Sequence, residues 1–337
     1  MKLNITSRSI YLSAALTAAA LTVVIWLTAG SLQARFDVVN QKYYAFFYPW
    51  QTHNPTTMAY ITAWVGYALH NILAWGIIFA AQRAKPKYDK DFRWFNWAML
   101  GVNMGGYLLH WLQTQLWYDG LAIAVPEVTS QGSVVLMLVF ILIMENPRRG
   151  LFFGSKVNFS QRFTQIIRRY HGYLFSWAVI YTFWYHPMEN TFGHLAGFFY
   201  MFLLMAQSVL IFNRAHINKY WTFALEAFVL IHGTLVAIYQ GNGLWPMFLF
   251  GFAAMIAVTQ IYGLGLKPWT ARLFGIGFAV AAGAFYILTD SLARINEVFR
   301  IPIVEYALVF AFYLLFLLIN GLIGLFRNRV HRVPDAL

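Results

Sequence analysis

The sequence predicts an all-α integral membrane protein with about ten transmembrane helices. Of its 337 residues, 60% are hydrophobic and only 11% are charged, whereas soluble domains carry about 25% charged residues. Apolar runs of roughly 20 residues, enough to cross a bilayer as a helix, recur along the chain. They lack the period-two alternation of a membrane β-barrel. We therefore expect one polytopic membrane domain over residues 1–337 and no soluble domain.

The predicted spans follow one another with short connections. The first is expected to remain as a signal anchor, because no small-x-small cleavage site bounds it before "SLQARFDVV". Later spans end at stretches rich in charge or proline, such as "AKPKYDKD" and "MENPRRG". The expected spans are residues 10–30, 56–82, 93–118, 128–145, 170–187, 192–213, 217–239, 244–264, 271–290 and 303–326.

The distribution of basic residues predicts the orientation in the membrane. With a cytoplasmic N-terminus, all but four of the 24 lysines and arginines fall on the cytoplasmic side, which is the pattern of the positive-inside rule. We therefore expect both termini to be cytoplasmic, in a bacterial-type inner membrane. The formal charge of +12 then reflects topology and contact with anionic membrane lipids, and it does not indicate nucleic acid as a partner. The four exceptions are Arg35, Lys42, Arg294 and Arg300.

The absence of cysteine limits the chemistry. A chain with no cysteine has no disulfides, no thiolate metal ligands, no iron–sulfur cluster and no covalently attached c-type haem. It also lacks a phosphate-binding loop and a dinucleotide fingerprint. A soluble electron donor is therefore expected to arrive on a partner protein, with a membrane quinone as the alternative donor.

Histidines within the spans are the main functional candidates. Polar side chains at membrane depth are costly and tend to be functional. An imidazole in such a place serves as a hydrogen-bonded structural group, a proton relay or a metal ligand. Seven of the nine histidines fall in or at the edges of the predicted spans, which favours a shared site.

Two helices carry histidines at both ends. In "RRYHGYLFSWAVIYTFWYHP", His171 and His186 are 15 residues apart, so on one helix they lie about 22 Å apart and within roughly 60° of each other. His216 and His232 repeat this layout, and they face one side only if His216 precedes the helix proper. The two predicted spans run in the same direction, which places His171 level with His216. Two stacked b-type haems would need this arrangement, with propionates paired to Arg168, Arg169 and Arg214.

Residues 168–240, with these four histidines, resemble the transmembrane b-type cytochromes of the ferric-reductase and cytochrome b561 type. The resemblance implies haem b bound by His171, His186, His216 and His232. It also implies electron transfer across the bilayer, from a cytoplasmic donor or quinol to an acceptor outside.

A second arrangement uses the predicted depths of the histidines. His110 and His232 lie level, with other candidates just above and below them. Such a group suits one haem, or a non-haem iron, copper or zinc centre with imidazole and carboxylate ligands. The candidate metal ligands are His70, His110, His186, His194, His232 and Glu226.

Three functions remain open from the sequence. The favoured one is a redox protein or membrane oxidoreductase with haem b or another His-ligated metal. The second is a transporter or channel with a path lined by His and Glu. The third is an enzyme acting on a lipid or quinone at the outer interface, where "LQTQLWYDGLAIAVPEVTSQG" gathers polar residues. That segment is equally well explained as a capped turn between two helices.

Overall fold

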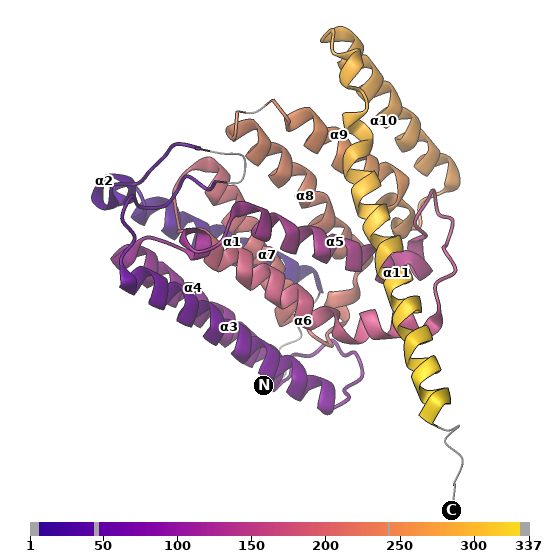
Figure 1. The fold of residues 1–337 in the computed structure, drawn as a ribbon, viewed down its shortest axis with the longest axis horizontal. Coiled ribbons are helices and arrows are strands. Elements are labelled where there is room, and N and C mark those ends of the chain that lie inside the picture. The colour runs from indigo at the N-terminus through magenta and orange to yellow at the C-terminus, as the bar shows by residue number, and fades with distance from the viewer. Residues whose placement is uncertain (1–6, 44–46, 242, 331–337) are drawn as a thin grey trace, which may run out of the picture. The chain divides into compact units, whose positions relative to one another are not determined.

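The computed structural model describes residues 7–43, 47–241 and 243–330, and their regular elements are α-helices and short 3-10 helices without a β-strand (Figure 1). The predicted all-α class is therefore confirmed. The chain divides into two compact units, residues 1–137 with 171–252 and residues 138–170 with 253–337. The elements are α1 (Ser7–Thr28), α2 (Leu32–Phe36), α3 (Thr57–Arg83), α4 (Trp94–Trp117), η1 (Leu121–Ile123), α5 (Glu127–Arg149), α6 (Gln161–Tyr185), α7 (Phe192–Val209), η2 (Arg214–Ile217), α8 (Lys219–Tyr239), α9 (Trp245–Val258), η3 (Gln260–Leu264), α10 (Pro268–Leu288), η4 (Leu292–Arg294) and α11 (Glu297–Val330).

We call the two parts unit 1 and unit 2. Unit 1 contains α1 to α4, α7 and α8 entire, whereas unit 2 contains α10 and α11 entire. Helices α5, α6 and α9 each contribute residues to both units. The prediction of a single membrane domain over 1–337 stays a prediction.

Seven helices in the described part of the chain are long and apolar enough to cross a membrane, which indicates a multi-pass membrane protein. The predicted spans 93–118 and 170–187 correspond to α4 and α6, which are not among the seven. The predicted span 244–264 is the shorter α9 followed by η3. Ten spans and cytoplasmic termini therefore stay predictions, and the basic residues at 1–6 and 331–337 lie outside the described residues.

Small residues let α3 pack closely on α4. The buried face of α3 repeats every three or four residues and includes Ala59, Ala63, Gly66 and His70, the spacing of one helix face. A Cβ at Gly66 would lie 2.1 Å from the Trp184 ring. Glycine there is thus required by the approach of α6, as expected where membrane helices pack through small residues.

The rest of unit 1 packs around α7. Helix α7 contacts α1, α4 and α8 and begins at the N-cap Thr191, whose hydroxyl accepts a hydrogen bond from the backbone of His194. Capping of this kind satisfies an amide that the helix itself leaves unpaired. The cap therefore fixes the first turn of α7 and the position of His194 within it.

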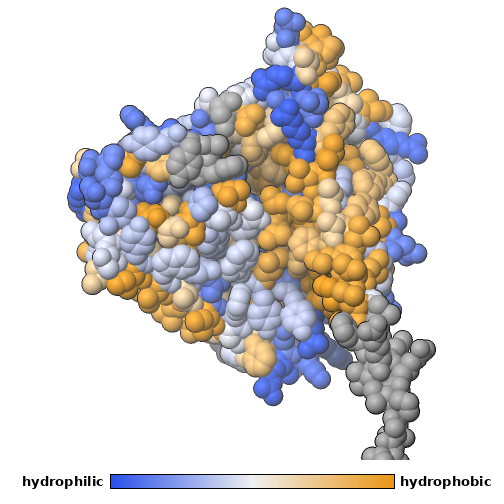
Figure 2. Space-filling model, viewed as in Figure 1, coloured by the Kyte–Doolittle hydropathy of each residue, from blue (hydrophilic) through white to orange (hydrophobic). Residues whose placement is uncertain are grey.

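Unit 2 is built around α10, α11 and two irregular segments. Helices α10 and α11 form an antiparallel pair joined by η4 (Figure 1), and hydrophobic residues cover much of α11 (Figure 2). Its leucines are exposed, for example Leu314 at 64%, as expected for a helix that faces lipid. Segments 150–155 and 259–264 contact each other and α11 through backbone and hydroxyl groups.

Candidate histidine sites

His70 lies between α3, α4 and α6 with both ring nitrogens engaged. Its Nε2 donates to Oδ1 of Asn103 at 3.2 Å, and its Nδ1 accepts from the indole of Trp184 at 3.3 Å. A Cβ at Gly106 would lie 2.4 Å from this ring, so α4 is shaped to admit it. The geometry is that of a neutral, hydrogen-bonded histidine between helices.

His110 is fully buried and likewise engaged on both sides of its ring. Nε2 donates to the backbone oxygen of His186 at 2.8 Å, and Nδ1 lies 3.2 Å from Oε1 of Gln113. The ring also packs against Trp184 at a centroid distance of 4.4 Å. His110 therefore anchors the residues after α6 to α4.

His186 and His194 meet at the connection between α6 and α7. Their ring centroids lie 5.7 Å apart, and Tyr48 from the 37–56 connection packs on both. The Tyr48 hydroxyl bonds Nε2 of His194, and the Thr191 hydroxyl lies 2.6 Å from Nδ1 of the same ring. Burial raises the pKa of Tyr48 well above its usual range, so the phenol keeps the proton that this bond uses.

His232 approaches the same cluster from α8. A Cβ at Gly197, one turn after His194 on α7, would lie 3.0 Å from the His232 ring. The Nδ1 atoms of His186 and His232 are buried and have no hydrogen-bond partner in the described part of the chain. Burial and the neighbouring imidazoles of His194 and His232 lower the pKa of His186, which leaves neutral nitrogen donors suited to a metal.

His171 and His216 form a second pair. Their ring centroids lie 6.3 Å apart with the ring planes tilted by 52°. Nδ1 of His216 donates to the backbone oxygen of Gln207 at 3.1 Å. This bond leaves the lone pair on Nε2, as in many metal-bound histidines. Burial and the nearby His171 lower the pKa of His216 to about 4, so the ring is neutral.

His216 precedes α8. It lies in η2, and α8 begins after the N-cap Asn218, whose side chain accepts from the backbone of Tyr220 and Trp221. The geometry of a single ideal helix therefore does not apply to His216 and His232. From the sequence, His216 and His232 face one side only if His216 precedes the helix proper, and the structure meets this condition.

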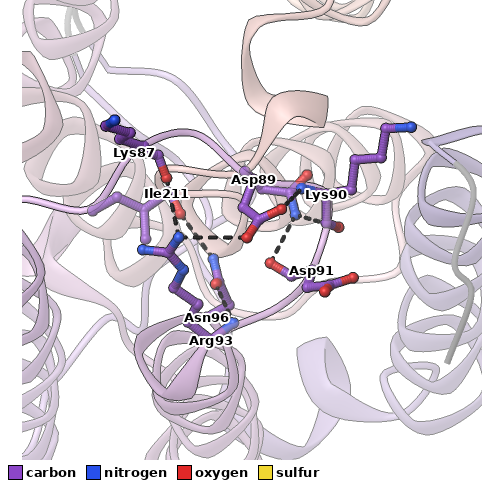
Figure 3. A network of polar contacts seen from close by, with 8 residues as sticks. Lys87, Asp89, Lys90, Asp91, Arg93, Asn96 and Ile211 are labelled. Carbon is purple, nitrogen blue, oxygen red and sulfur yellow. Dashed lines mark hydrogen bonds and ion pairs between the residues drawn. The ribbon is translucent and has the colours of Figure 1, made fainter. Parts of the chain in front are cut away.

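A loop network holds η2 in place. In the loop between α3 and α4, the backbone of Asp89 pairs with that of Phe212 and Arg214. In the first turn of α4, Asn96 donates to the backbone oxygen of Ile211 at 2.9 Å (Figure 3). The buried Asn213 donates to the oxygen of Lys90 at 3.0 Å and accepts from the backbone of Ala215. Buried amides that are fully bonded at both ends position their segment strongly, and here that segment carries His216.

Buried acidic residues of unit 1 lie in the connections after α4 and α6 and at the start of α5. Tyr118 donates to Oε1 of Glu189 at 2.6 Å, and both oxygens of Asp119 accept from Thr52. Burial raises the pKa of Asp119 and of Glu189, and the hydrogen bonds from their partners oppose the rise. Glu127 is shared by Lys42, Gln131 and Gln240. The acidic residues of the polar segment at 113–131 are thus bonded to other parts of the protein, and the reading of this segment as a capped turn stays a prediction.

The remaining candidates have other surroundings. Glu226 is buried in α8 next to Tyr200. Within unit 2, Arg168 donates to the oxygen of Met144 and Arg169 lies over the Tyr170 ring. The backbone of Arg214 donates to the oxygen of Asp89. Their predicted pairing with haem propionates stays a prediction.

Among the described residues, no three histidine or acidic side chains are grouped closely enough to hold a metal ion. The predicted metal centre of His70, His110, His186, His194, His232 and Glu226 stays a prediction. The histidines gather in two places: His171 lies beside His216, and His186 lies near His194 and His232.

Several residues of these sites were not predicted. Tyr48 belongs to "YYAFFYPW", which reads as an interfacial aromatic belt, and residues 44–46 of it lie outside the described residues. Thr191 has a local signal, since an N-cap three residues before a histidine reaches that residue's backbone. Asn103 and Trp184 have none, because their contacts with His70 join three helices.

No family model, curated protein or solved structure matches this chain. The chemistry of the histidine pairs therefore carries the functional inference.

Proposed function

We propose that the protein is a multi-pass membrane redox protein that binds haem b through histidine pairs of unit 1. The observation that carries the proposal is the pair His171 and His216, with ring centroids 6.3 Å apart and Nδ1 of His216 held by Gln207. Two imidazoles suffice for a haem iron, because the porphyrin supplies the other nitrogen ligands.

A second haem or metal is proposed at His186 and His232. Their buried Nδ1 atoms lack partners, and a buried polar atom without a partner costs about 1–3 kcal/mol unless something binds it. A ligand there removes that cost. The bound iron supplies one-electron redox chemistry, while the chain orients the imidazoles and excludes water from them.

The arrangement supports electron transfer along α6 and α8. His171 on α6 lies beside His216 in η2, just before α8. His186, just after α6, is proposed to act with His232 on α8. The two pairs therefore lie at opposite ends of α6 and α8. Redox centres at two depths suit the passage of electrons across a bilayer, from a partner protein or a quinol to an acceptor outside. We infer the orientation from the basic residues: both termini cytoplasmic, in a bacterial-type inner membrane.

An absorption spectrum of the purified protein tests the proposal. We expect a Soret band that shifts, and a sharp alpha band that appears, when dithionite reduces the protein. The variants H171A and H216A lose that part of the spectrum, whereas H53A, which removes an exposed loop histidine, keeps it. A colourless protein without metal by elemental analysis, or unchanged spectra in both site variants, contradicts the proposal.

The orientation has its own test, because the chain contains no cysteine. Asp290→Cys places a thiol in the exposed connection after α10, and Lys87→Cys places one in the loop after α3. In intact cells a membrane-impermeant maleimide is expected to label D290C and to label K87C only after permeabilisation. The reverse result overturns the orientation and leaves the haem proposal standing.

A further inference from the structure

Unit 2 contains a buried polar junction where α11 meets two irregular segments. The backbone oxygen of Leu151 accepts from the hydroxyl of Thr259 at 2.7 Å and from the hydroxyl of Tyr306 at 3.2 Å. Thr259 and Tyr306 also bond each other. Irregular backbone inside an apolar helical protein persists where such bonds satisfy it or where it lines a site.

Two acceptors flank this junction without donors. Gln260 follows Thr259 and is 8% exposed, and Glu305 precedes Tyr306 and is 2% exposed. Oε1 of Gln260 and Oε2 of Glu305 are buried and have no hydrogen-bond partner within the described residues. The redox proposal uses neither side chain.

An unpaired carboxylate is costly in these surroundings, whereas a carboxylic acid is not. Burial of an isolated charge costs far more than burial of a neutral hydrogen-bonding group, and ionisable residues within membrane helices are candidate functional sites. Glu305 lies within the apolar window Leu292–Ile323. The charged or titratable neighbours of the junction are Tyr306 on the same helix and Arg149 at the end of α5, whose charge acts on Tyr306.

Glu297 on the same helix provides the contrast. It is 3% exposed, yet its Oε1 forms an ion pair with Arg294 at 3.0 Å and its Oε2 lies 3.4 Å from the Tyr286 hydroxyl. The partners of Glu297 stabilise an ionised carboxylate. Two acids of equal burial on one helix thus have opposite surroundings.

We propose that Glu305 is a proton-binding site. Its carboxyl takes up a proton from water, which forms the O–H bond on Oε2, and releases it to water when that bond breaks. Protonation removes the charge from a buried carboxyl that has no partner to stabilise it.

Carbodiimide labelling of the full-length protein in detergent tests the proposal, because dicyclohexylcarbodiimide reacts with protonated carboxyls in apolar surroundings. Peptide mass spectrometry is expected to find the adduct on Glu305 and not on Glu297. Above the pKa of the carboxyl, the rate of labelling falls about tenfold per pH unit, as the protonated fraction does. E305Q loses the labelled peptide, and E297Q keeps the label on Glu305.

A second measurement guards against poor access of the reagent or poor folding of the variants. Infrared difference spectra of the wild-type protein after a pH jump are expected to show loss of a protonated carboxyl band, and the band is absent in E305Q. Equal labelling of Glu297 and Glu305, or no adduct on Glu305 together with no carboxyl band, overturns the proposal. Protection by sodium ions at constant pH assigns the site to a cation and overturns it as well.

Discussion

Two histidine regions of unit 1 differ in how their ring nitrogens are used. Between α3 and α4, His70 and His110 each have both nitrogens in contact with protein atoms. Where the end of α6 meets α8, His186 and His232 each have a buried Nδ1 without a partner among the described residues. The contacts of the first region are those of structural histidines, whereas an unpartnered buried nitrogen costs about 1–3 kcal/mol unless something binds it. This difference supports the proposal that a ligand binds in the second region.

The largest expected effect is the loss of His110. H110A removes the donor to His186 and leaves a cavity beside Trp184, which costs about 2–5 kcal/mol. Thermal or denaturant unfolding in detergent measures the loss, with H53A as the control. If H110A were as stable as H53A and lacked cofactor, His110 would be a ligand and the comparison would fail.

Gly106 tests how closely His70 is held. G106A places a Cβ 2.4 Å from the His70 ring, and overpacking of this kind costs about 1–3 kcal/mol. G105A is the matched control, since nothing lies within 4 Å of a Cβ there. A lower unfolding midpoint for G106A alone is expected. Equal midpoints would show that His70 is not packed as described.

Asn213 sharpens the account at the other pair. N213A removes the hydrogen bonds to Lys90 and Ala215, which costs about 1–3 kcal/mol and frees η2 to move. We expect reduced occupancy of the His171 and His216 pair, seen as a smaller alpha band per protein. N54A, an exposed asparagine, serves as the control. An unchanged band in N213A would show that the hydrogen bonds of Asn213 do not position His216 for cofactor binding.

The smallest effect concerns Asp119 and pH. Burial raises the pKa of Asp119 in the folded protein above its usual value of about 3.9. The folded protein then binds more protons than the unfolded one as the pH rises above about 4, so the free energy of unfolding decreases with pH in this range. D119N removes this contribution and gives a flatter pH profile of the unfolding midpoint.

The sequence predicts some of this organisation because helical spacing is local. Apolar composition predicts the all-α class, and the shared direction of α6 and α8 predicts that His171 lies level with His216. The contact of His110 with Gln113 also has a local signal, since residues three apart share a helix face. The number of spans does not follow from hydropathy alone. Helices α4 and α6 contain many polar and aromatic residues, which lower their mean hydropathy.

Contacts between distant segments have no such signal. The bond from His110 to the backbone of His186 depends on how α4 meets the end of α6, where Gly120 is so close that a Cβ would lie 2.5 Å from the oxygen of Tyr185. Glu305 stands alone in "IPIVEYALVF" and was not predicted. Its only sequence signal is a single acid in an apolar run, and the missing partners are visible only in the structure.

The most direct test of the central claim is the metal-to-protein ratio of four purified variants measured with the wild type. H186A and H232A are predicted to lose the metal held at their pair, while H70A and H110A retain it in whatever fraction remains folded. Equal metal content in all five proteins, or loss confined to H70A and H110A, would contradict the proposal that His186 and His232 bind a ligand.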